Sequence, residues 1–338
     1  MTNSDQDPIR HIFEQAMGYM YSGALRAVAL LGVADHLADG PRDPGELAEL
    51  TAANGPFLRR LLRFLATRGV FREDEDGRFH LTPHAEVLRS DVPNSIRAGV
   101  LTVTSDLFWL STGDFVEAVR HGEPAFDLRY GRSFFEYLTE NPETGVMFAE
   151  GMASMSAGET AHVVASYDFP DTGVVVDVGG GRGGLLLDLL RFRPELFGVL
   201  LDHEQVVESH VLGQLGEDDR WKLVPGDFFE SVPAGDLYLV KNVLHDWNDE
   251  QCVRILRNCR AAMNTGARVL VVDAVLPSGN EPHFGKAVDI MMLLLASGQE
   301  RTRSEFERLF ASAGLRLTRV IPIAGAFSLS VIEAEVVD

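Results

Sequence analysis

The stretch from residue 174 to residue 190 constrains the fold of this 338-residue chain more than any other. It begins with three valines, Val174–Val176, and reaches Asp177. Five glycines then fill six positions, from Gly179 to Gly184, and a leucine-rich run follows. A short apolar run is typical of a buried parallel strand, and glycine permits sharp turns and close approach of a ligand. The stretch therefore predicts strand, glycine-rich turn and helix, the first unit of a nucleotide-binding α/β sheet.

The glycine spacing alone does not identify the ligand. Gly179-x-Gly181-x-x-Gly184 fits the dinucleotide fingerprint, in which a helix N-terminus holds a pyrophosphate. However, acidic residues follow three successive predicted strands, at Asp177, Asp202 and Asp227. Three carboxylates around one crevice would repel a pyrophosphate and suit a cationic ligand. The acids therefore favour a cationic nucleotide-like ligand over a dinucleotide.

The C-terminal half reads as an alternation of strands and helices. Predicted strands lie at 174–176, 199–201, 223–224, 236–240, 268–272, 316–321 and 328–333, and predicted helices at 249–263, 286–295 and 305–313. Alternating strands and helices indicate an α/β fold with a largely parallel sheet. Ligands bind such sheets outside the carboxyl ends of the strands, where His245, Asp273 and Glu300 also fall.

The first hundred residues read as helices followed by one hairpin. A helical stripe runs from 24 to 38, and Asp43-Pro44 starts a short helix with Leu47 and Leu50 inward. A further helix follows Asn54, and Asp76-Gly77 indicates a hairpin turn. Helix, turn, helix and hairpin form a winged helix, which binds DNA or serves as a structural, dimerising module. The acidic hairpin tip and the net charge of −20 favour the second.

The segment between the two halves is helical and rich in large apolar residues. We expect three domains or segments: 1–100, a winged-helix-like module; 101–165, a helical linker; and 166–338, the α/β domain. Apolar ligand sites tend to form where domains join, and methionine adapts to aromatic ligands. The residues that we expect to line a substrate pocket are Trp109, Met152 and Met155 in the linker, and Met291 and Met292 on the helix 286–295.

Three motifs in order carry a family resemblance. Asp177-Val-Gly-Gly-Gly-Arg-Gly, Gly226-Asp-Phe-Phe and Leu244-His-Asp-Trp resemble the class I S-adenosylmethionine-dependent small-molecule O-methyltransferases. The most similar group is that of bacterial enzymes that tailor antibiotics and aromatic polyketides, related to plant caffeate and isoflavone O-methyltransferases. The resemblance covers about residues 14 to 335. It implies a Rossmann-like methyltransferase domain, an N-terminal winged-helix dimerisation domain and a homodimer in which each N-terminal domain closes over the partner's pocket.

The resemblance also implies a catalytic set. His245 takes the place of the general base, and Asp273 and Glu300 take the places of the two acids that orient its ring. Many plant members have Glu where this chain has Asp273, and the shorter side chain leaves its contact with His245 open. We expect Asp246 to face away from His245 and to cap the following helix.

The cofactor that the resemblance implies is S-adenosylmethionine, and its acceptor is the hydroxyl of an aromatic small molecule. The glycine turn passes the methionine end, Asp202 takes the ribose hydroxyls, and Asp227 and Phe228 flank the adenine. The full set of expected cofactor-binding residues is Asp177, Gly179, Gly181, Asp202, Asp227, Phe228, Lys241 and Trp247.

Two rival uses of these residues remain open. One His with two acids can also hold a metal ion, but no second His lies near His245, and the resemblance implies no metal. A protein of the same fold can also bind S-adenosylmethionine and support hydroxylation or cyclisation without methyl transfer. The presence of His245 favours methyl transfer.

The two cysteines and the apolar pattern bear on the compartment. Cys252 and Cys259 lie seven positions apart on one predicted helix, about 10 Å along its axis, too far for a disulfide. They read as core thiols in a reducing environment. No signal peptide and no apolar run of about 18 residues is visible, so we expect a cytoplasmic protein without membrane or nucleic-acid partners.

Overall fold

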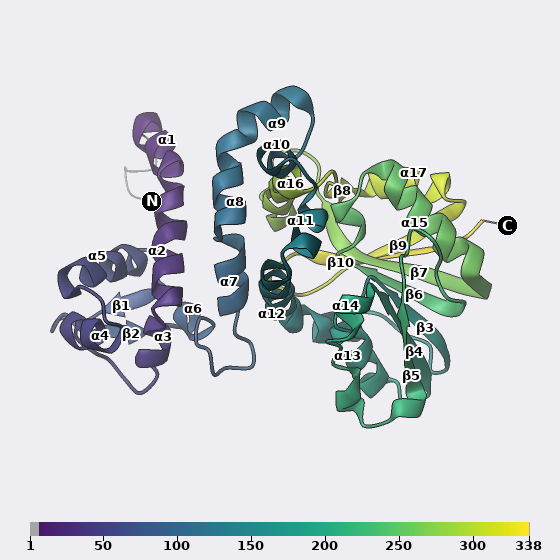
Figure 1. The fold of residues 1–338 in the computed structure, drawn as a ribbon, viewed down its shortest axis with the longest axis horizontal. Helices are drawn as coiled ribbons and strands as arrows, with labels where there is room; N and C mark the ends of the chain where they lie inside the picture. Colours follow the sequence, from purple (N-terminus) through teal and green to yellow (C-terminus); the bar gives the residue numbers. More distant parts are fainter. Residues whose placement is uncertain (1–6, 338) are drawn as a thin grey trace. The chain divides into compact units, whose positions relative to one another are not determined.

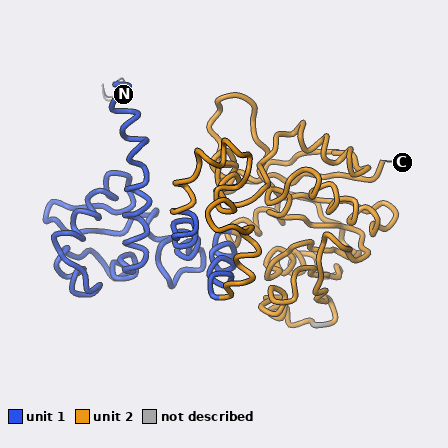
Figure 2. Tube along the Cα trace, turned by 45° about the horizontal axis from the view of Figure 1, so that its top comes forward, with its two compact units in different colours: residues 1–109, 143–155 blue, residues 110–142, 156–338 orange. Residues whose placement is uncertain are grey.

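The computed structural model describes residues 7–337 of the chain. The chain folds into two compact units, residues 1–109 with 143–155, and residues 110–142 with 156–338 (Figure 2). Residues 1–6 of the expected first domain lie outside the described part. The segment expected as one linker, 101–165, is divided between the two units.

The first unit is a helical module with one small hairpin. Its elements are α1 (Pro8–Ala16), α2 (Gly18–Leu30), α3 (Val33–His36), α4 (Pro44–Leu50), α5 (Gly55–Ala66), β1 (Phe71–Glu73), β2 (Phe79–Leu81), α6 (Pro83–Glu86) and α7 (Arg97–Val103), followed by α8 (Asp106–Ser111) at the unit's boundary. Asp43 caps α4 with a capping box, as the sequence predicts. Asn54, which the sequence places only at the break before the next helix, also caps α5. The hairpin around Gly77 is confirmed.

Two details of the first unit differ from the sequence prediction. The helix expected over 24–38 is two helices, because Gly32 adopts a left-handed conformation (φ +64°) and ends the hydrogen-bond ladder between α2 and α3. Leu50, expected inward, is 49% exposed at the last position of α4. Leu47 one turn earlier is fully buried, so the short helix has room for one buried leucine at this face.

The second unit carries the α/β sheet (Figure 1). Its elements are η2 (Thr112–Asp114), α9 (Phe115–His121), α10 (Ala125–Tyr130), α11 (Phe134–Glu140), the C-terminal part of α12 (Pro142–Ser166), β3 (Gly173–Val178), α13 (Gly184–Phe192), β4 (Leu196–Asp202), α14 (Glu204–Val207), η3 (Leu212–Leu215), η4 (Asp218–Arg220), β5 (Trp221–Pro225), β6 (Gly235–Lys241), η5 (Leu244–Asp246), α15 (Asp249–Ala262), β7 (Met263–Leu276), α16 (Phe284–Leu295), β8 (Arg301–Thr302), α17 (Arg303–Ser312), β9 (Leu315–Pro322) and β10 (Leu329–Val336).

The sheet order is β5-β4-β3-β6-β7-β10-β9, with β8 paired to β7. Strands β3 to β7 run parallel, and β10 is antiparallel to both β7 and β9. The first strand of this sheet along the chain, β3, lies in its middle. From β3 the chain adds β4 and β5 on one side, and then returns to add β6 and β7 on the other side. The order therefore reverses beside β3, the position at which α/β sheets bind nucleotides.

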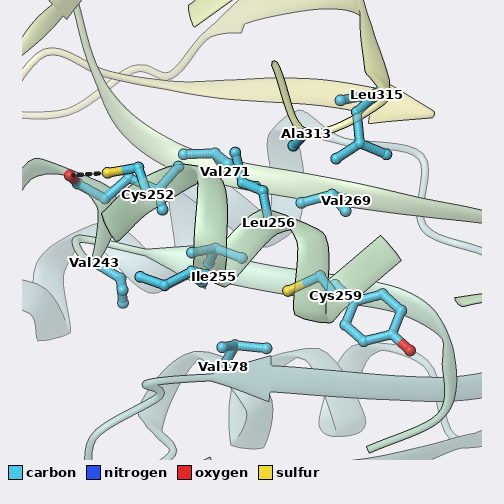
Figure 3. Packing of buried hydrophobic residues seen from close by; sticks show 14 of the residues in the cluster. Val178, Val243, Cys252, Ile255, Leu256, Cys259, Val269, Val271, Ala313 and Leu315 are labelled. Carbon is cyan, nitrogen blue, oxygen red and sulfur yellow. Dashed lines mark hydrogen bonds between the residues drawn. The ribbon is translucent and has the colours of Figure 1, made fainter. Parts of the chain in front are cut away.

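The period of two along the strands supplies a core on each face of the sheet. On β7, Val269 and Val271 face the helices α15 and α17, while Leu270 and Val272 face α12 and α13. Figure 3 shows the first of these cores, in which Cys252 and Cys259 of α15 pack among valines and leucines. Both cysteines are free and fully buried, which confirms them as core thiols. The α/β fold class predicted from the sequence is confirmed.

Two strands differ from expectation. β7 spans fourteen residues rather than the five predicted, since it starts at Met263, in the predicted helix 249–263, and continues past Asp273. The two-residue β8 was not predicted, and it brings Arg301 beside Val275 of β7. Within the described residues, no helix has the length and apolar character needed to cross a membrane.

Candidate active site

The glycine-rich turn lies between β3 and α13, and its glycines have no side chains that would keep neighbouring groups or a ligand at a distance. Gly179, Gly181 and Gly183 have φ values of +66°, +59° and +80°, which side chains other than hydrogen rarely allow. A Cβ on Gly179 would lie 2.9 Å from a methyl carbon of Val243 and 3.3 Å from the ring of Phe228. The turn therefore passes directly beneath the residues that follow β5 and β6.

Asp202 ties the second strand to this turn. It is the last residue of β4, and its Oδ2 accepts a hydrogen bond from the Gly181 N–H at 2.8 Å. Its Oδ1 accepts another from the His203 N–H at 2.7 Å. Burial raises the pKa of this carboxyl, and the two N–H donors act in the opposite direction. The structure thus brings together two of the residues predicted to bind the cofactor.

Asp177 is a buried carboxylate with no bond to satisfy it. Its side chain is 1% exposed, and neither oxygen has a hydrogen-bond partner among the described residues. Burial raises its pKa to about 7, and the nearby Lys241 acts against this rise. Lys241 itself donates from Nζ to the Ser156 Oγ at 2.6 Å, and burial lowers its pKa. An orphaned carboxylate beside a side-chain-free turn fits a ligand that brings positive charge.

A cluster of aromatic side chains lies beside the turn that follows β5. Asp227 accepts the Phe229 N–H at 2.7 Å, which fixes the turn that carries Phe228. Trp247 meets Phe229 edge to face at 4.8 Å between ring centroids and stacks on Phe135 of α11 at 5.5 Å with an interplanar angle of 22°. The contribution of Phe135 was missed, because sequence periodicity assigns it to a helical core and cannot reveal the stacking.

His245 lies in the short turn η5, directly after β6. Its Nδ1 is 2.8 Å from the Glu300 Oε1, so this N–H donates to the carboxylate, and its Nε2 is 3.7 Å from the Asp246 Oδ1. Burial alone lowers the pKa of the ring, but Asp246, Glu300 and Asp273 outweigh it and raise the pKa to about 10. The side chain is 15% exposed, so the ring is held but still open on one side.

The prediction that Asp246 caps the next helix is wrong. Asn248 caps α15, with its side chain accepting the Gln251 N–H in a capping box. Asp246 instead points its carboxyl toward the Nε2 edge of His245, and burial raises its pKa to about 6. The cap position depends on where the η5 turn ends, which propensity did not resolve.

Asp273 lies near His245 without bonding to it. It is fully buried on β7, one residue beyond the pairing of Val272 with Lys241. Neither of its oxygens has a hydrogen-bond partner in the described part of the chain, and burial raises its pKa to about 7. The shorter side chain noted in the sequence is thus linked to His245 by charge alone. The orienting contact in the structure comes from Glu300.

A second layer of residues behind Glu300 escaped sequence reasoning. The Glu300 N–H donates to the Asp289 Oδ1 at 2.9 Å, so α16 anchors the acid. Arg301 is a charged residue with a side chain only 1% exposed, and a Cβ on Gly298 would overlap the carbonyl oxygen of His245. The sequence shows an arginine directly after the candidate acid, but its burial and its contacts appear only in the structure.

The predicted pocket residues lie in different units. Trp109, Met152 and Met155 belong to the first, where Trp109 packs edge-on against Tyr19 at 6.4 Å. Met291 and Met292 belong to α16 in the second, with Met292 buried and Met291 half-buried. Across residues 7–337, no group of three or more His, Cys, Asp or Glu side chains is placed to hold a metal ion.

Comparison with known proteins places this geometry in a family. Residues 113–316 match the model of an O-methyltransferase domain, and residues 13–91 match that of an O-methyltransferase dimerisation domain. The chain is 42% identical to the phenazine O-methyltransferase of Lysobacter antibioticus over 96% of this chain and 95% of the relative.

Solved structures agree with this placement. A methyltransferase of calicheamicin biosynthesis, in its S-adenosylhomocysteine-bound form, superposes with a TM-score of 0.90 at 46% identity, covering 98% of this chain and 100% of the other. An O-methyltransferase from neocarzinostatin biosynthesis, in complex with S-adenosylmethionine and 2-hydroxy-5-methyl naphthoic acid, gives 0.76 at 35% identity, covering 94% and 96%. The chain therefore belongs to the S-adenosylmethionine-dependent O-methyltransferases that join a methyltransferase domain to a dimerisation domain.

Proposed function

We propose that this enzyme methylates a hydroxyl group of an aromatic small molecule, with His245 as the general base and Glu300 as the residue that orients it. The observation that carries the proposal is the 2.8 Å bond from His245 Nδ1 to the Glu300 carboxylate, which leaves Nε2, 3.7 Å from the Asp246 Oδ1, as the ring nitrogen that would meet the acceptor. The relatives named above, which act in phenazine chemistry and in calicheamicin and neocarzinostatin biosynthesis, support an acceptor from secondary metabolism.

The cofactor site we propose uses the residues around the glycine turn. Gly179, Gly181 and Asp177 would hold the methionine end, where the amino group needs an anionic partner. Asp202 would hold the ribose hydroxyls, and Asp227 and Phe228 the adenine, with Lys241 and Trp247 at the rim. S-adenosylmethionine supplies, when bound, an electrophilic methyl group on a positively charged sulfur with a neutral leaving group. The remaining task for the protein is to provide a nucleophile.

The nucleophile needs a base because a phenol has a pKa near ~10 and is mostly protonated at neutral pH. A positioned imidazole that accepts the hydroxyl proton at Nε2 accelerates such a step by roughly 10²–10⁴-fold. Three acids raise the pKa of His245 to about 10, so the ring is protonated at neutral pH in the ligand-free protein. The proposal therefore requires the positive charge of the bound cofactor to lower this pKa before Nε2 can accept the hydroxyl proton. Glu300 stabilises the imidazolium that forms and fixes which nitrogen carries the proton.

The pocket and the assembly belong to the same proposal. We assign Trp109, Met152, Met155, Met291 and Met292 to the aromatic acceptor. We propose a homodimer through the N-terminal domain, supported by helix α1, which buries none of its residues and exposes three large apolar side chains, Ile9, Ile12 and Phe13, by 69%, 66% and 65%. A cytoplasmic location is proposed on the free, buried state of both cysteines.

The direct test is a product assay with S-adenosylmethionine and a panel of hydroxynaphthoates and phenazine phenols. We expect at least one acceptor to gain a single methyl group on oxygen, read by mass spectrometry and carbon chemical shift. S-adenosylmethionine consumption that yields a hydroxylated or cyclised product without an added methyl group would contradict the proposal and support the diverted chemistry.

A further inference from the structure

Arg301 is the most completely bonded side chain near the candidate active site. It lies on β8, and its guanidinium group is buried with a side-chain exposure of 1%. Nε and Nη2 both donate to the Asp249 Oδ1, at 2.9 and 2.7 Å. Nη1 donates to the Leu244 carbonyl at 2.9 Å and to the Gln299 carbonyl at 3.3 Å, and Nη2 to the Trp247 carbonyl at 2.9 Å. Five bonds match the five donors that a guanidinium offers.

The two loop carbonyls that Arg301 holds lie on either side of His245. Leu244 precedes the histidine and Trp247 follows Asp246, so the guanidinium spans the whole η5 turn. The Cys252 thiol reaches the same Leu244 carbonyl at 3.1 Å, as the dashed line in Figure 3 shows. The backbone of Gly298 lies against this turn so closely that a Cβ there would overlap the His245 carbonyl oxygen.

Arg301 also fixes the acid that bonds to His245. Glu300 is its neighbour in the chain, and the Gln299 carbonyl on the other side of Glu300 accepts one of the Arg301 bonds. One guanidinium therefore holds the backbone that carries the imidazole and the backbone that carries the carboxylate. The distance between Nδ1 and Oε1 depends on both, and small misplacements of catalytic groups cost rate heavily.

On these contacts, we propose that Arg301 is a positioning residue for methyl transfer, which keeps the His245 ring in the orientation bonded to Glu300 with Nε2 toward the acceptor. The inference rests on the proposed role of His245. Lysine cannot replace arginine here, because an ammonium group has three donors and no planar fork, whereas the four acceptors are the Asp249 carboxylate and the carbonyls of Leu244, Gln299 and Trp247.

The test compares Arg301→Lys with Arg220→Lys. Arg220 is a matched control, since it bonds the Leu190 carbonyl and Glu217 with a side-chain exposure of 16%, away from the candidate site. We expect Arg301→Lys to lower kcat by roughly 10–100-fold, with acceptor KM and S-adenosylhomocysteine affinity within about twofold of wild type. The hydrogen-bonded His245 Nδ1–H signal in proton NMR should broaden or vanish. Arg220→Lys should change neither kcat nor the signal.

A second variant decides the question if Arg301→Lys does not fold. Asp249→Ala removes the carboxylate that accepts two of the five bonds from Arg301. The Asp249 side chain is 65% exposed, and Glu250→Ala in the same helical turn is the control. We expect Asp249→Ala to lower kcat by roughly 3–10-fold and to weaken the Nδ1–H signal.

An unchanged kcat and an unchanged signal in the folded variants would overturn the proposal. The NMR signal also separates this inference from the proposed function. If His245→Ala keeps full turnover, His245 is not the base, while the signal in Arg301→Lys still reports whether Arg301 fixes the ring.

Discussion

Burial of the Asp177 carboxylate in its charged form destabilises the folded protein, and we expect a bound cationic ligand to offset this destabilisation. Its pKa is raised to about 7 by burial, above the ordinary value of an aspartate, so the charged form is disfavoured in the folded state. The protonated Asp177 therefore favours the folded state at low pH, and this contribution to the free energy of unfolding is lost as pH rises from about 4 to about 7. The same burial that weakens the fold prepares a site for positive charge.

The Asp177→Asn substitution tests this balance. At pH 8 the variant should melt higher than wild type, by roughly 2 °C or more, because no buried charge remains to be desolvated. The difference should disappear near pH 4, where wild-type Asp177 is protonated. S-adenosylhomocysteine affinity should fall about tenfold by calorimetry. A lower melting temperature at pH 8, or unchanged affinity, would contradict the assignment.

The Glu300→Gln substitution separates charge from hydrogen bonding at His245. Glutamine keeps an oxygen to accept the Nδ1–H but removes the negative charge, so the pKa of His245 should fall from about 10 toward 6.5, as followed by NMR titration. We expect kcat to fall roughly tenfold. Asp74→Asn breaks a similar pair, in which His80 Nε2 lies 2.8 Å from the carboxylate in the hairpin, and should leave kcat unchanged.

Motif spacing predicted which residues gather at the candidate site better than it predicted their contacts. His245 and Glu300 are 55 positions apart in the chain and meet through one hydrogen bond. The spacing could not show that Asp273 falls short of His245 or that Asp246 turns toward it, because both depend on side-chain reach within a turn of three residues. Local chemistry at this scale is set by tertiary packing.

At the scale of elements, the turn η5 depends on the segment that leads into β8. Gly298 lies where any Cβ would overlap the His245 backbone, so Gly298→Ala should displace the turn. We expect kcat to fall by roughly 10²-fold with a smaller effect on S-adenosylhomocysteine affinity, measured by steady-state kinetics and calorimetry. Gly158→Ala on α12, where a Cβ meets nothing within 4 Å, is the control and should retain activity. If Gly298→Ala were as active as Gly158→Ala, the close contact between Gly298 and the His245 backbone would not be needed for activity.

Alternation predicted the long strands of the sheet, and periodicity and caps predicted the helices α4, α5, α15, α16 and α17, whereas the separate helices between residues 94 and 165 were expected only as one helical segment. Three further differences have identifiable causes. The apolar stripe over 24–38 continues across Gly32, so periodicity could not detect the break that its positive φ imposes. The two residues of β8 are too few to produce any alternation. After Met263, the first residues of β7 (Asn264, Thr265 and Gly266) are polar or small and exposed, so the sequence gives no sign of the strand that pairs with its parallel neighbour β6.

At the scale of the whole molecule, the chain is predicted to be a dimer. The protein should sediment at about twice the 37.1 kDa chain mass at micromolar concentration. Replacing Ile12 and Phe13 of α1 by Glu should yield a monomer, because both side chains are about two-thirds exposed in the single chain and would be buried by a partner. Phe192→Glu, at an exposed position on α13, should leave the dimer intact. A wild-type monomer would contradict the prediction.

The division into units could not be obtained from the sequence. Residues 101–165 have the composition of one helical linker, yet Glu143–Met155 group with the N-terminal unit and the rest of α12 with the α/β unit. This grouping depends on interactions between segments far apart in the chain, such as the hydrogen bond from the Gly99 N–H to the Ser154 hydroxyl at 3.0 Å. Helical periodicity carries no information about such pairings.

The central claim is that His245 accepts the hydroxyl proton, and His245→Ala tests it most directly. With an acceptor of pKa above ~9, we predict that kcat falls by roughly 10²-fold or more, that the acid limb of the pH–rate profile disappears and that S-adenosylhomocysteine affinity stays nearly unchanged. His80→Ala, at the hairpin histidine paired with Asp74, should behave as wild type. Near-full turnover in His245→Ala with the same acid limb would contradict the account and leave proximity as the source of catalysis.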